Sequence, residues 1–289
     1  MKLVTFLYQN RTRLGALTAS GNEVVDLNLA NNAIPDSIIA FLEAGGQALT
    51  LAQQAVSSAP AAATIQRSAV TLKAPIPRPG KIICIGLNYR DHAGETGQAV
   101  PTFPTVFAKF NNCVIGPDEP IVIPKLTEQV DYEAELAFVI GKKARHVPVG
   151  QALDYVAGYV PFHDVSARDY QNRTSQWTLG KTFETFGPMG PALVTADEIP
   201  DPQSLDISLS IGGEVLQKSN TRELVFGIRE LLSILSGIMT LEPGDLVSTG
   251  TPSGVGVARN PKRWLRPGET VKLEIAKLGV LSNPVIAES

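Results

Sequence analysis

Three carboxylates alternate along one short stretch of the chain, Asp131, Glu133 and Glu135, and the apolar run 136–140 follows directly. In an extended strand, alternate side chains point to the same face, so these acids are expected to project together. The run that follows is apolar on both faces, which predicts a strand in the protein interior. Carboxylates beside such a strand lose hydration and repel one another. This pattern constrains the fold more than any other feature of the sequence.

Two interpretations of the acidic strand are open. A fourth carboxylate, Asp164, follows the stretch 157–162. The group stays ionised if a hard divalent cation lies among the oxygens, since Mg²⁺, Mn²⁺ and Ca²⁺ all take carboxylate ligands. Alternatively, the strand lies at a sheet edge and its acidic face is solvated. The spacing alone does not decide between a metal site and a solvated edge.

The composition excludes several kinds of partner. The net charge is −3 and no Lys/Arg run occurs, so we expect neither nucleic acid nor an anionic membrane as a partner. No apolar run approaches the ~18 residues of a membrane helix. The two cysteines, Cys84 and Cys113, do not form a disulfide framework, which indicates a reducing compartment. The N-terminal apolar stretch is too short for a signal peptide, so we expect a cytoplasmic protein.

The chain is expected to divide near residue 72 into a small N-terminal domain, 1–72, and a catalytic domain, 73–289. A stretch rich in proline, 74–80, marks the junction. The N-terminal part predicts short strands at 2–8, 12–18 and 23–27, and helices within 36–56 that Gly45-Gly46 separates. The second part predicts one clear helix, 221–240, capped by Asn220 or Thr221. Its expected strands are 81–85, 105–109, 121–123, 133–140, 157–162, 207–211, 246–248 and 270–275.

Several polar residues outside the acidic strand are candidates for chemistry. On a helix, His92 and Glu95 are i,i+3 neighbours, and a carboxylate that accepts the imidazole N–H favours a general base. The alternative is a surface histidine near a glutamate. Lys181 has apolar neighbours, where it either pairs with an acid or neutralises a substrate anion. The loop 249–256 contains glycines that bring backbone amides close to an anion, unless it is a simple tight turn.

Five segments together resemble the fumarylacetoacetate hydrolase superfamily. They are 86–92, 131–136, 163–171, 180–191 and 248–256, and they occur in the family's order. Two of them, 163–169 and 180–188, look most like the subgroup called fumarylacetoacetate hydrolase domain-containing protein 2 and its bacterial relatives. The resemblance implies a β-rich α+β fold, a mixed β-sandwich or roll with few helices and a small N-terminal α+β unit. It also implies a homodimer.

The resemblance assigns roles residue by residue. It implies one Mg²⁺ per site, with Mn²⁺ or Ca²⁺ as alternatives. Asp131 is then a flanking residue, and His163 stands where many members carry another residue, so a histidine there is expected to orient a ligand carboxylate. The implied metal ligands are Glu133, Glu135 and Asp164; the implied catalytic residues are His92, Glu95 and Lys181; the implied substrate contacts are Lys109, Arg168, Gln171, Thr251 and, in the same loop, Gly250.

These residues predict a metal-dependent hydrolase that cleaves a C–C bond in an acylpyruvate or other β-diketo acid. His92, oriented by Glu95, activates water, and Lys181 holds the leaving enolate. We expect the segment 89–103 to close over this small 2-oxo or 1,3-diketo carboxylate. The alternative uses the same enolate chemistry in oxaloacetate tautomerisation or decarboxylation, or in isomerisation or hydration of a 2-oxo acid. A non-catalytic protein that binds a sugar acid or a metal is a third hypothesis.

Overall fold

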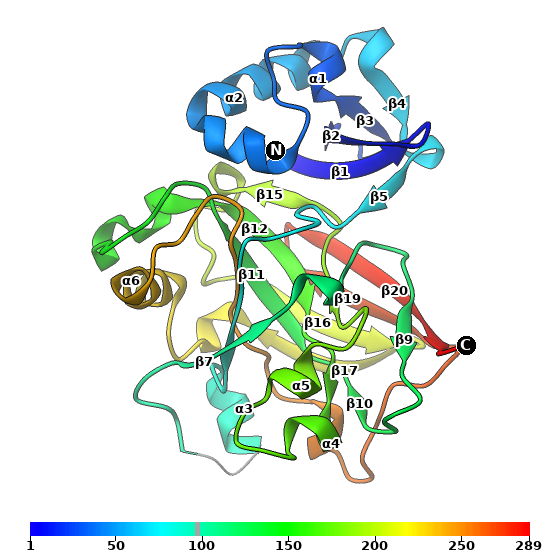
Figure 1. The fold of residues 1–289 in the computed structure, drawn as a ribbon, viewed down its shortest axis with the longest axis vertical. Helices are drawn as coiled ribbons and strands as arrows, with labels where there is room; N and C mark the ends of the chain where they lie inside the picture. The colour runs from blue at the N-terminus through cyan, green and yellow to red at the C-terminus, as the bar shows by residue number, and fades with distance from the viewer. Residues whose placement is uncertain (96–98) are drawn as a thin grey trace.

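Two β-sheets packed face to face form the body of the protein (Figure 1). The structure is a computed structural model that describes residues 1–95 and 99–289. The larger sheet contains β1 (Lys2–Tyr8), β2 (Arg11–Leu17), β3 (Glu23–Asp26), β4 (Thr64–Gln66), β5 (Thr71–Lys73), β6 (Ile82–Gly86), β7 (Thr105–Lys109), β11 (Ala134–Ile140), β12 (Val156–His163), β15 (Leu193–Thr195) and β18 (Leu246–Ser248). The second sheet contains β9 (Ile121–Ile123), β16 (Asp206–Ile211), β17 (Glu214–Asn220), β19 (Thr270–Ile275) and β20 (Gly279–Ala287). This β-rich architecture confirms the expected mixed fold.

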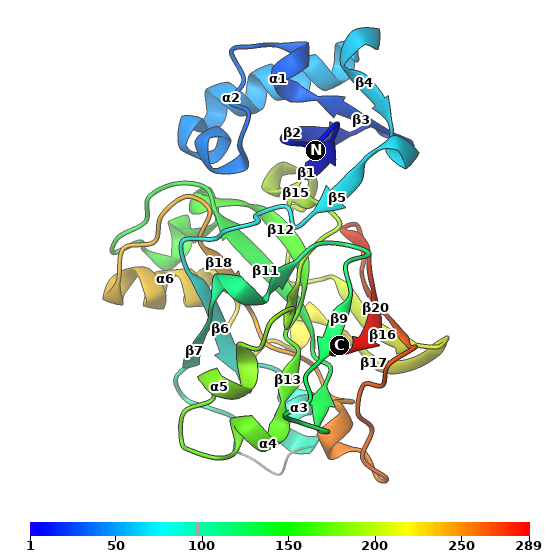
Figure 2. The same ribbon diagram turned by 45° about the vertical axis from the view of Figure 1, so that its right-hand side comes forward.

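Short elements and a few helices complete the chain. Two small ladders pair β10 (Val130–Asp131) with β13 (Ser166–Ala167) and β8 (Val114–Ile115) with β14 (Gly187–Pro188). The α-helices are α1 (Leu27–Ala30), α2 (Ile38–Ser58), α3 (Arg90–Glu95), α4 (Arg168–Gln171), α5 (Thr178–Lys181) and α6 (Ile228–Ile238). In Figure 2, α3, α4 and α5 lie together at one end of the main body.

The strand that follows the acidic stretch is the centre of the fold. Every residue of β11 is buried. It pairs antiparallel with β12 on one side and with β18 on the other, and it packs against β16 in the second sheet. Because 136–140 is apolar on both faces, this strand is stable only where both faces are covered. The predicted interior strand is therefore confirmed, and the carboxylates at its start enter a buried environment.

The N-terminal part is continuous with the main body through hydrogen bonding. β1 pairs with β15, with Lys2 opposite Val194 and Leu3 opposite Leu193. The expected boundary at residue 72 falls inside β5, which pairs with β1. The division into domains 1–72 and 73–289 therefore stays a prediction. Among the described residues, no helix combines the length and the apolar character needed to cross a bilayer.

Two helices differ from their expected limits for local reasons. Gly45 interrupts α2 with φ 64° and ψ −142°, so the expected break at the glycine pair is present. The helix expected at 221–240 instead begins at Ile228, and 221–223 is a single 3₁₀ turn capped by Asn220. Asn88 explains the shorter helix, because its hydrogen bonds to the backbone of Val225 and Phe226 hold the intervening segment in a non-helical bend.

Candidate metal centre and substrate cavity

Three buried carboxylates meet where β11 begins and β12 ends. Glu133 and Glu135 flank the first residue of β11, and Asp164 follows the last residue of β12. The antiparallel pairing sets Ala134 opposite His163, and Asp164 N donates to Glu133 O at 3.0 Å. One oxygen from each of the three side chains lies within 4.8 Å of the others. The geometry thus brings together the three residues expected to bind metal.

Three buried cations lie among these carboxylates. Lys181 Nζ donates to Glu133 Oε2 at 2.7 Å and to Asp164 Oδ2 at 2.8 Å, and Lys109 Nζ donates to Asp164 Oδ1 at 2.6 Å. Arg168 Nη2 lies 2.6 Å from Glu133 Oε1, an ion pair that is not aligned as a hydrogen bond. Burial alone would raise the pKa of Glu133, but Lys181 and Arg168 outweigh burial and hold that pKa well below its usual value.

With every carboxylate ionised, this cluster carries one more negative charge than positive charges. Among the described residues it holds the carboxylates of Asp131, Glu133, Glu135 and Asp164, and the cations of Lys109, Arg168 and Lys181. Burial raises the pKa of Glu135 well above its usual value, and the charges of Asp164 and Glu133 raise it further. A divalent cation would favour the ionised form of Glu135 and offset the excess negative charge, and hard cations prefer oxygen ligands of this kind. The residues present therefore fit Mg²⁺, Mn²⁺ or Ca²⁺.

The last residue of β18 and the loop after it hold Glu135 in place. Ser248 Oγ donates to Glu135 Oε2, and Gly250 N donates to the same oxygen at 2.9 Å. Gly250 has φ +97°, and a Cβ there would come within 2.9 Å of both the Asn88 side chain and the Ile85 carbonyl. Glycine is therefore required at this turn. Gly250 was expected to contact substrate, but its amide binds a carboxylate of the protein.

Asp131 contacts this cluster through Arg168 but does not join the three candidate metal ligands, although the alternation predicted a shared face. Its Oδ1 accepts from Gly256 N at 2.7 Å, and its Oδ2 accepts from Val257 N at 3.0 Å and from Arg168 Nε at 2.8 Å. The regular strand is interrupted between β10 and β11, at Tyr132 and Glu133, so the period of two does not extend through all three acids. Asp131 anchors a loop and the arginine, in agreement with its expected flanking position.

The expected His–Glu pair is formed on α3. His92 Nδ1 lies 3.2 Å from Glu95 Oε2, and Gly254 N donates to Glu95 Oε1 at 2.9 Å. Asp91 Oδ2 accepts from Ser219 Oγ at 3.1 Å, which fastens the helix to β17. His92 is buried. The alternative of a surface histidine is therefore wrong.

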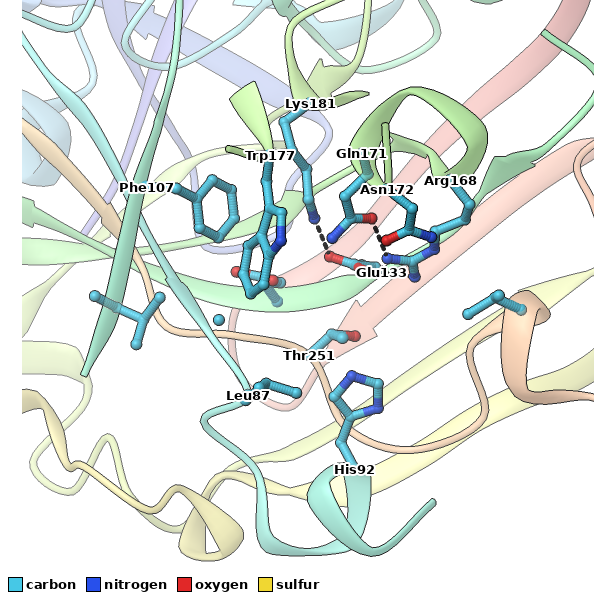
Figure 3. A pocket seen from close by; sticks show the side chains of 14 residues that line it. Leu87, His92, Phe107, Glu133, Arg168, Gln171, Asn172, Trp177, Lys181 and Thr251 are labelled. Carbon is cyan, nitrogen blue, oxygen red and sulfur yellow. Dashed lines mark hydrogen bonds and ion pairs between the residues drawn. The ribbon is translucent and has the colours of Figure 1, made fainter. Parts of the chain in front are cut away.

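A cavity of about 270 Å³ lies between α3 and the carboxylates (Figure 3). The His92 ring and the Lys181 ammonium approach it from opposite sides. Two aromatic residues of its wall, Phe107 and Trp177, have no predicted role; Trp177 precedes Lys181 by four residues, a spacing that places both on one helical face. The lining consists of Ile85, Gly86, Leu87, His92, Phe107, Glu133, Glu135, Arg168, Gln171, Asn172, Trp177, Lys181, Thr251 and Val257.

Three expected substrate contacts line this cavity: Arg168, Gln171 and Thr251. Arg168 Nη1 donates to Gln171 Oε1 at 2.8 Å, so the amide of Gln171 has a fixed direction and its Nε2 remains as a donor. Arg168 also forms ion pairs with Asp131 and Glu133, so its guanidinium is held by the protein, and its contact with substrate stays a prediction. We propose that Gln171 and Thr251 contact substrate directly.

Lys109 lies behind the metal ligands. Its ammonium is fully buried and donates to Asp164 Oδ1 and to the Val165 carbonyl, and the residue does not line the cavity. The resemblance implies that Lys109 contacts substrate, but the side chain lies behind Asp164 and outside the cavity lining. The β6–β7 pairing, with Ile82 opposite Lys109, directs the lysine to the ligand.

Lys109→Met is therefore expected to destabilise the metal-free protein by about 3–5 kcal/mol, because removing one partner leaves a buried carboxylate uncompensated. Urea unfolding of the variant and wild type, both in EDTA, measures the difference. Lys272→Met, at an exposed position of β19, is the control and should change little. Wild-type stability combined with a raised KM would instead support a direct substrate contact.

His163 does not perform the expected orienting role through its Nε2. This atom is buried and has no hydrogen-bond partner among the described residues. Burial, together with the nearby charge of Lys109, lowers the pKa of His163 to about 3, so the imidazole is neutral. A neutral ring adds no charge beside Asp164. The segment 89–103, expected to close over substrate, includes residues 96–98, which lie outside the described residues; its closure stays a prediction.

The chain is similar in sequence to a known protein family and to curated proteins. Residues 81–286 match the family model described as "Fumarylacetoacetate (FAA) hydrolase C-terminal". The chain is 46% identical to the mitochondrial oxaloacetate tautomerase Fahd2a of Rattus norvegicus, over 99% of this chain and 92% of that protein. It is 43% identical to the mitochondrial oxaloacetate tautomerase FAHD2A of Homo sapiens, again over 99% and 92%.

A solved structure matches over its full length. The maleylpyruvate hydrolase of Sphingobium sp. SYK-6, crystallised with manganese(II) and pyruvate, has a TM-score of 0.82 and 30% identity, with 100% of both chains covered. The expected cytoplasmic location is contradicted by the names of the curated relatives, several of which are mitochondrial. The prediction failed because neither the small number of cysteines nor the short N-terminal apolar stretch identifies one compartment.

Proposed function

Because the chain belongs to the fumarylacetoacetate hydrolase family, we propose that this metal-dependent enzyme is an oxaloacetate tautomerase. One observation carries the proposal: two ligand carboxylates and the Lys181 ammonium line a single small cavity, with the third ligand beside them. Such a site suits a small 2-oxo dicarboxylate. The hydrolase activity expected first from the sequence has weaker support than this alternative, because the relatives at 46% and 43% identity carry the name tautomerase, whereas the maleylpyruvate hydrolase is 30% identical.

Glu133, Glu135 and Asp164 would hold the cation, which when bound would act as a Lewis acid toward the 2-oxo group of the substrate. We propose Mg²⁺, with Mn²⁺ or Ca²⁺ as alternatives. The maleylpyruvate hydrolase that contains manganese supports a divalent ion in this fold.

Side chains of the protein transfer the proton and stabilise the negative charge that forms on the substrate. Tautomerisation transfers one proton between C3 of oxaloacetate and the oxygen on C2. Burial opposes the charged form of Lys181, but Asp164 and Glu133 outweigh burial and raise its pKa, so the lysine stays cationic and stabilises negative charge on that oxygen. We assign the base to His92, because Glu95 accepts its Nδ1–H and thereby makes Nε2 the basic nitrogen.

Hydrolysis of a C–C bond is the second candidate, and the His92–Glu95 pair is the observation that favours it. A histidine oriented by a carboxylate suits removal of a proton from water as well as from carbon. The similarity to a maleylpyruvate hydrolase also supports this chemistry. The two activities differ in substrate and in product, so they are separable by assay.

The test supplies the pure enol form of oxaloacetate, with Mg²⁺ or with EDTA, and follows the loss of enol absorbance. We expect conversion to be accelerated with Mg²⁺ and to return to the uncatalysed rate in EDTA. Acetylpyruvate, tested in parallel, reports hydrolysis through release of pyruvate. Rapid cleavage of acetylpyruvate with no effect on oxaloacetate would reverse the order of the two candidates. The expected homodimer stays a prediction that analytical ultracentrifugation tests.

A further inference from the structure

Gln217 is a buried amide that joins two parts of the candidate site. The residue lies on β17 and is 1% exposed. Its Oε1 accepts from the backbone N–H of Ala134, at 2.9 Å, and Ala134 stands between two of the proposed metal ligands. Its Nε2 donates to Thr251 Oγ1 at 2.8 Å and to the Pro252 carbonyl at 2.9 Å. Every hydrogen-bonding atom of this amide is thus used within the protein.

These partners fix the direction of the amide. A backbone N–H can only donate and a carbonyl can only accept, so Oε1 faces Ala134 and Nε2 faces Pro252. The same Nε2 group donates to Thr251, whose hydroxyl oxygen must then act as the acceptor. The hydroxyl hydrogen of Thr251 has no acceptor among the described residues. Because Thr251 lines the cavity, that hydrogen is available to a bound molecule (Figure 3).

A β-bulge places Gln217 in this position. The ladder between β16 and β17 pairs Leu209 with Gln217 and Ser210 with Val215, so Leu216 is an extra residue. Leu216 and Gln217 are consequently buried side by side, whereas a regular strand would direct one of them to solvent. A bulge that redirects a side chain beside an active site is a recurrent device.

We propose that Gln217 is a positioning residue that holds the Thr251 hydroxyl as a hydrogen-bond donor to an oxygen of the substrate anion. The amide achieves this without adding charge to a cluster that already contains several ionised groups. The effect is selective, because a ligand with an acceptor at this point is bound and a ligand with a donor there is not. The identity of the substrate as a 2-oxo dicarboxylate rests on the proposed function.

The experiment combines Gln217→Met, Thr251→Val and the double variant, all saturated with Mg²⁺. Oxomalonate serves as the probe, since this 2-oxo dicarboxylate has no C–H proton to transfer and binds without tautomerising. Isothermal titration measures its Kd, and oxaloacetate kinetics give KM and kcat. We expect each single variant to weaken oxomalonate about tenfold, the value of one hydrogen bond, with KM rising similarly and kcat within about twofold. Lys218→Met, at the adjacent exposed position of β17, should match wild type.

The double variant provides the decisive comparison. If Gln217 acts through Thr251, the double variant should bind oxomalonate as weakly as Thr251→Val alone. Additive losses, or unchanged binding in Gln217→Met, would overturn the proposal. If Gln217→Met does not fold, Gln217→Glu provides the test: its carboxylate takes the Thr251 hydrogen, so affinity should fall at least tenfold, and wild-type affinity would refute the role. A wild type that binds oxomalonate but does not tautomerise oxaloacetate contradicts the proposed function alone.

Discussion

Glu135→Gln is expected to abolish tautomerase activity and to weaken Mg²⁺ binding by more than about 100-fold, since even the loss of an outer-shell partner costs 10–100-fold. The substitution keeps the size of the side chain and retains an oxygen that can accept from Ser248 and Gly250. The fold should therefore be preserved while one ligand charge is lost. Isothermal titration with Mg²⁺ measures the affinity, and Glu214→Gln at an exposed position of β17 is the matched control.

The stability of the same variant should change in a characteristic direction. Burial, together with Asp164 and Glu133, raises the folded-state pKa of Glu135 above the value in an unfolded chain. A raised carboxyl pKa contributes stability at low pH that is lost as the pH rises through the folded-state value. Glutamine remains neutral, so the metal-free variant should equal or exceed wild type in stability at neutral pH. Free Mg²⁺ at 100 times the wild-type Kd should stabilise wild type by about 2.7 kcal/mol and the variant by less than about 0.5 kcal/mol.

Thermal unfolding with EDTA and with Mg²⁺ tests both statements together. A variant that retains the wild-type increase in Tm with Mg²⁺ would show that Glu135 is not a ligand. A variant that loses much of its stability in EDTA would show that the charged form of Glu135 stabilises the metal-free fold, contrary to its raised pKa.

The metal ligands could be predicted from sequence because their positions depend on local geometry. Glu133 and Glu135 flank the start of a strand that is apolar on both faces, and Asp164 follows the strand paired with it. An antiparallel ladder brings such positions together without any further information. Asp131 shows the limit of this argument. The alternation continues through it in the sequence, but the backbone leaves the strand at 132–133.

The supporting residues could not be predicted because long-range packing decides them. Lys109 was expected to contact substrate, and only the pairing of β6 with β7 shows that it lies behind Asp164. Gln217 depends on a bulge whose extra residue, Leu216, has no signature in the amino-acid pattern. The helix expected at 221–240 begins later, because Asn88 binds the segment before it from a site more than a hundred residues away. Propensity yields to tertiary contacts in each case.

The His92–Glu95 pair can serve either candidate reaction, so variants of this pair test which reaction the site catalyses. His92→Ala should lower kcat/KM for oxaloacetate by about 10²–10⁴-fold, the contribution of a positioned general base. Mg²⁺ affinity should change little, because His92 is not one of the three proposed ligands. Stopped-flow measurement of enol conversion tests the first statement, and titration with Mg²⁺ tests the second.

Glu95→Gln is the second variant to test, because it retains the size of the side chain that contacts His92 and removes its charge. If the carboxylate fixes the tautomer of His92, this variant should fall close to His92→Ala, because the amide nitrogen that faces Nδ1 can only donate and leaves the proton on Nε2. Gly254 N can still donate to the remaining amide oxygen, so α3 should stay in place. If His92→Ala instead retains tautomerisation but loses cleavage of acetylpyruvate, the pair activates water, and the proton at C3 of oxaloacetate is removed by another group. Among the described residues that line the cavity, Lys181 is then one candidate, although its charged state, held by Asp164 and Glu133, makes it a poor base.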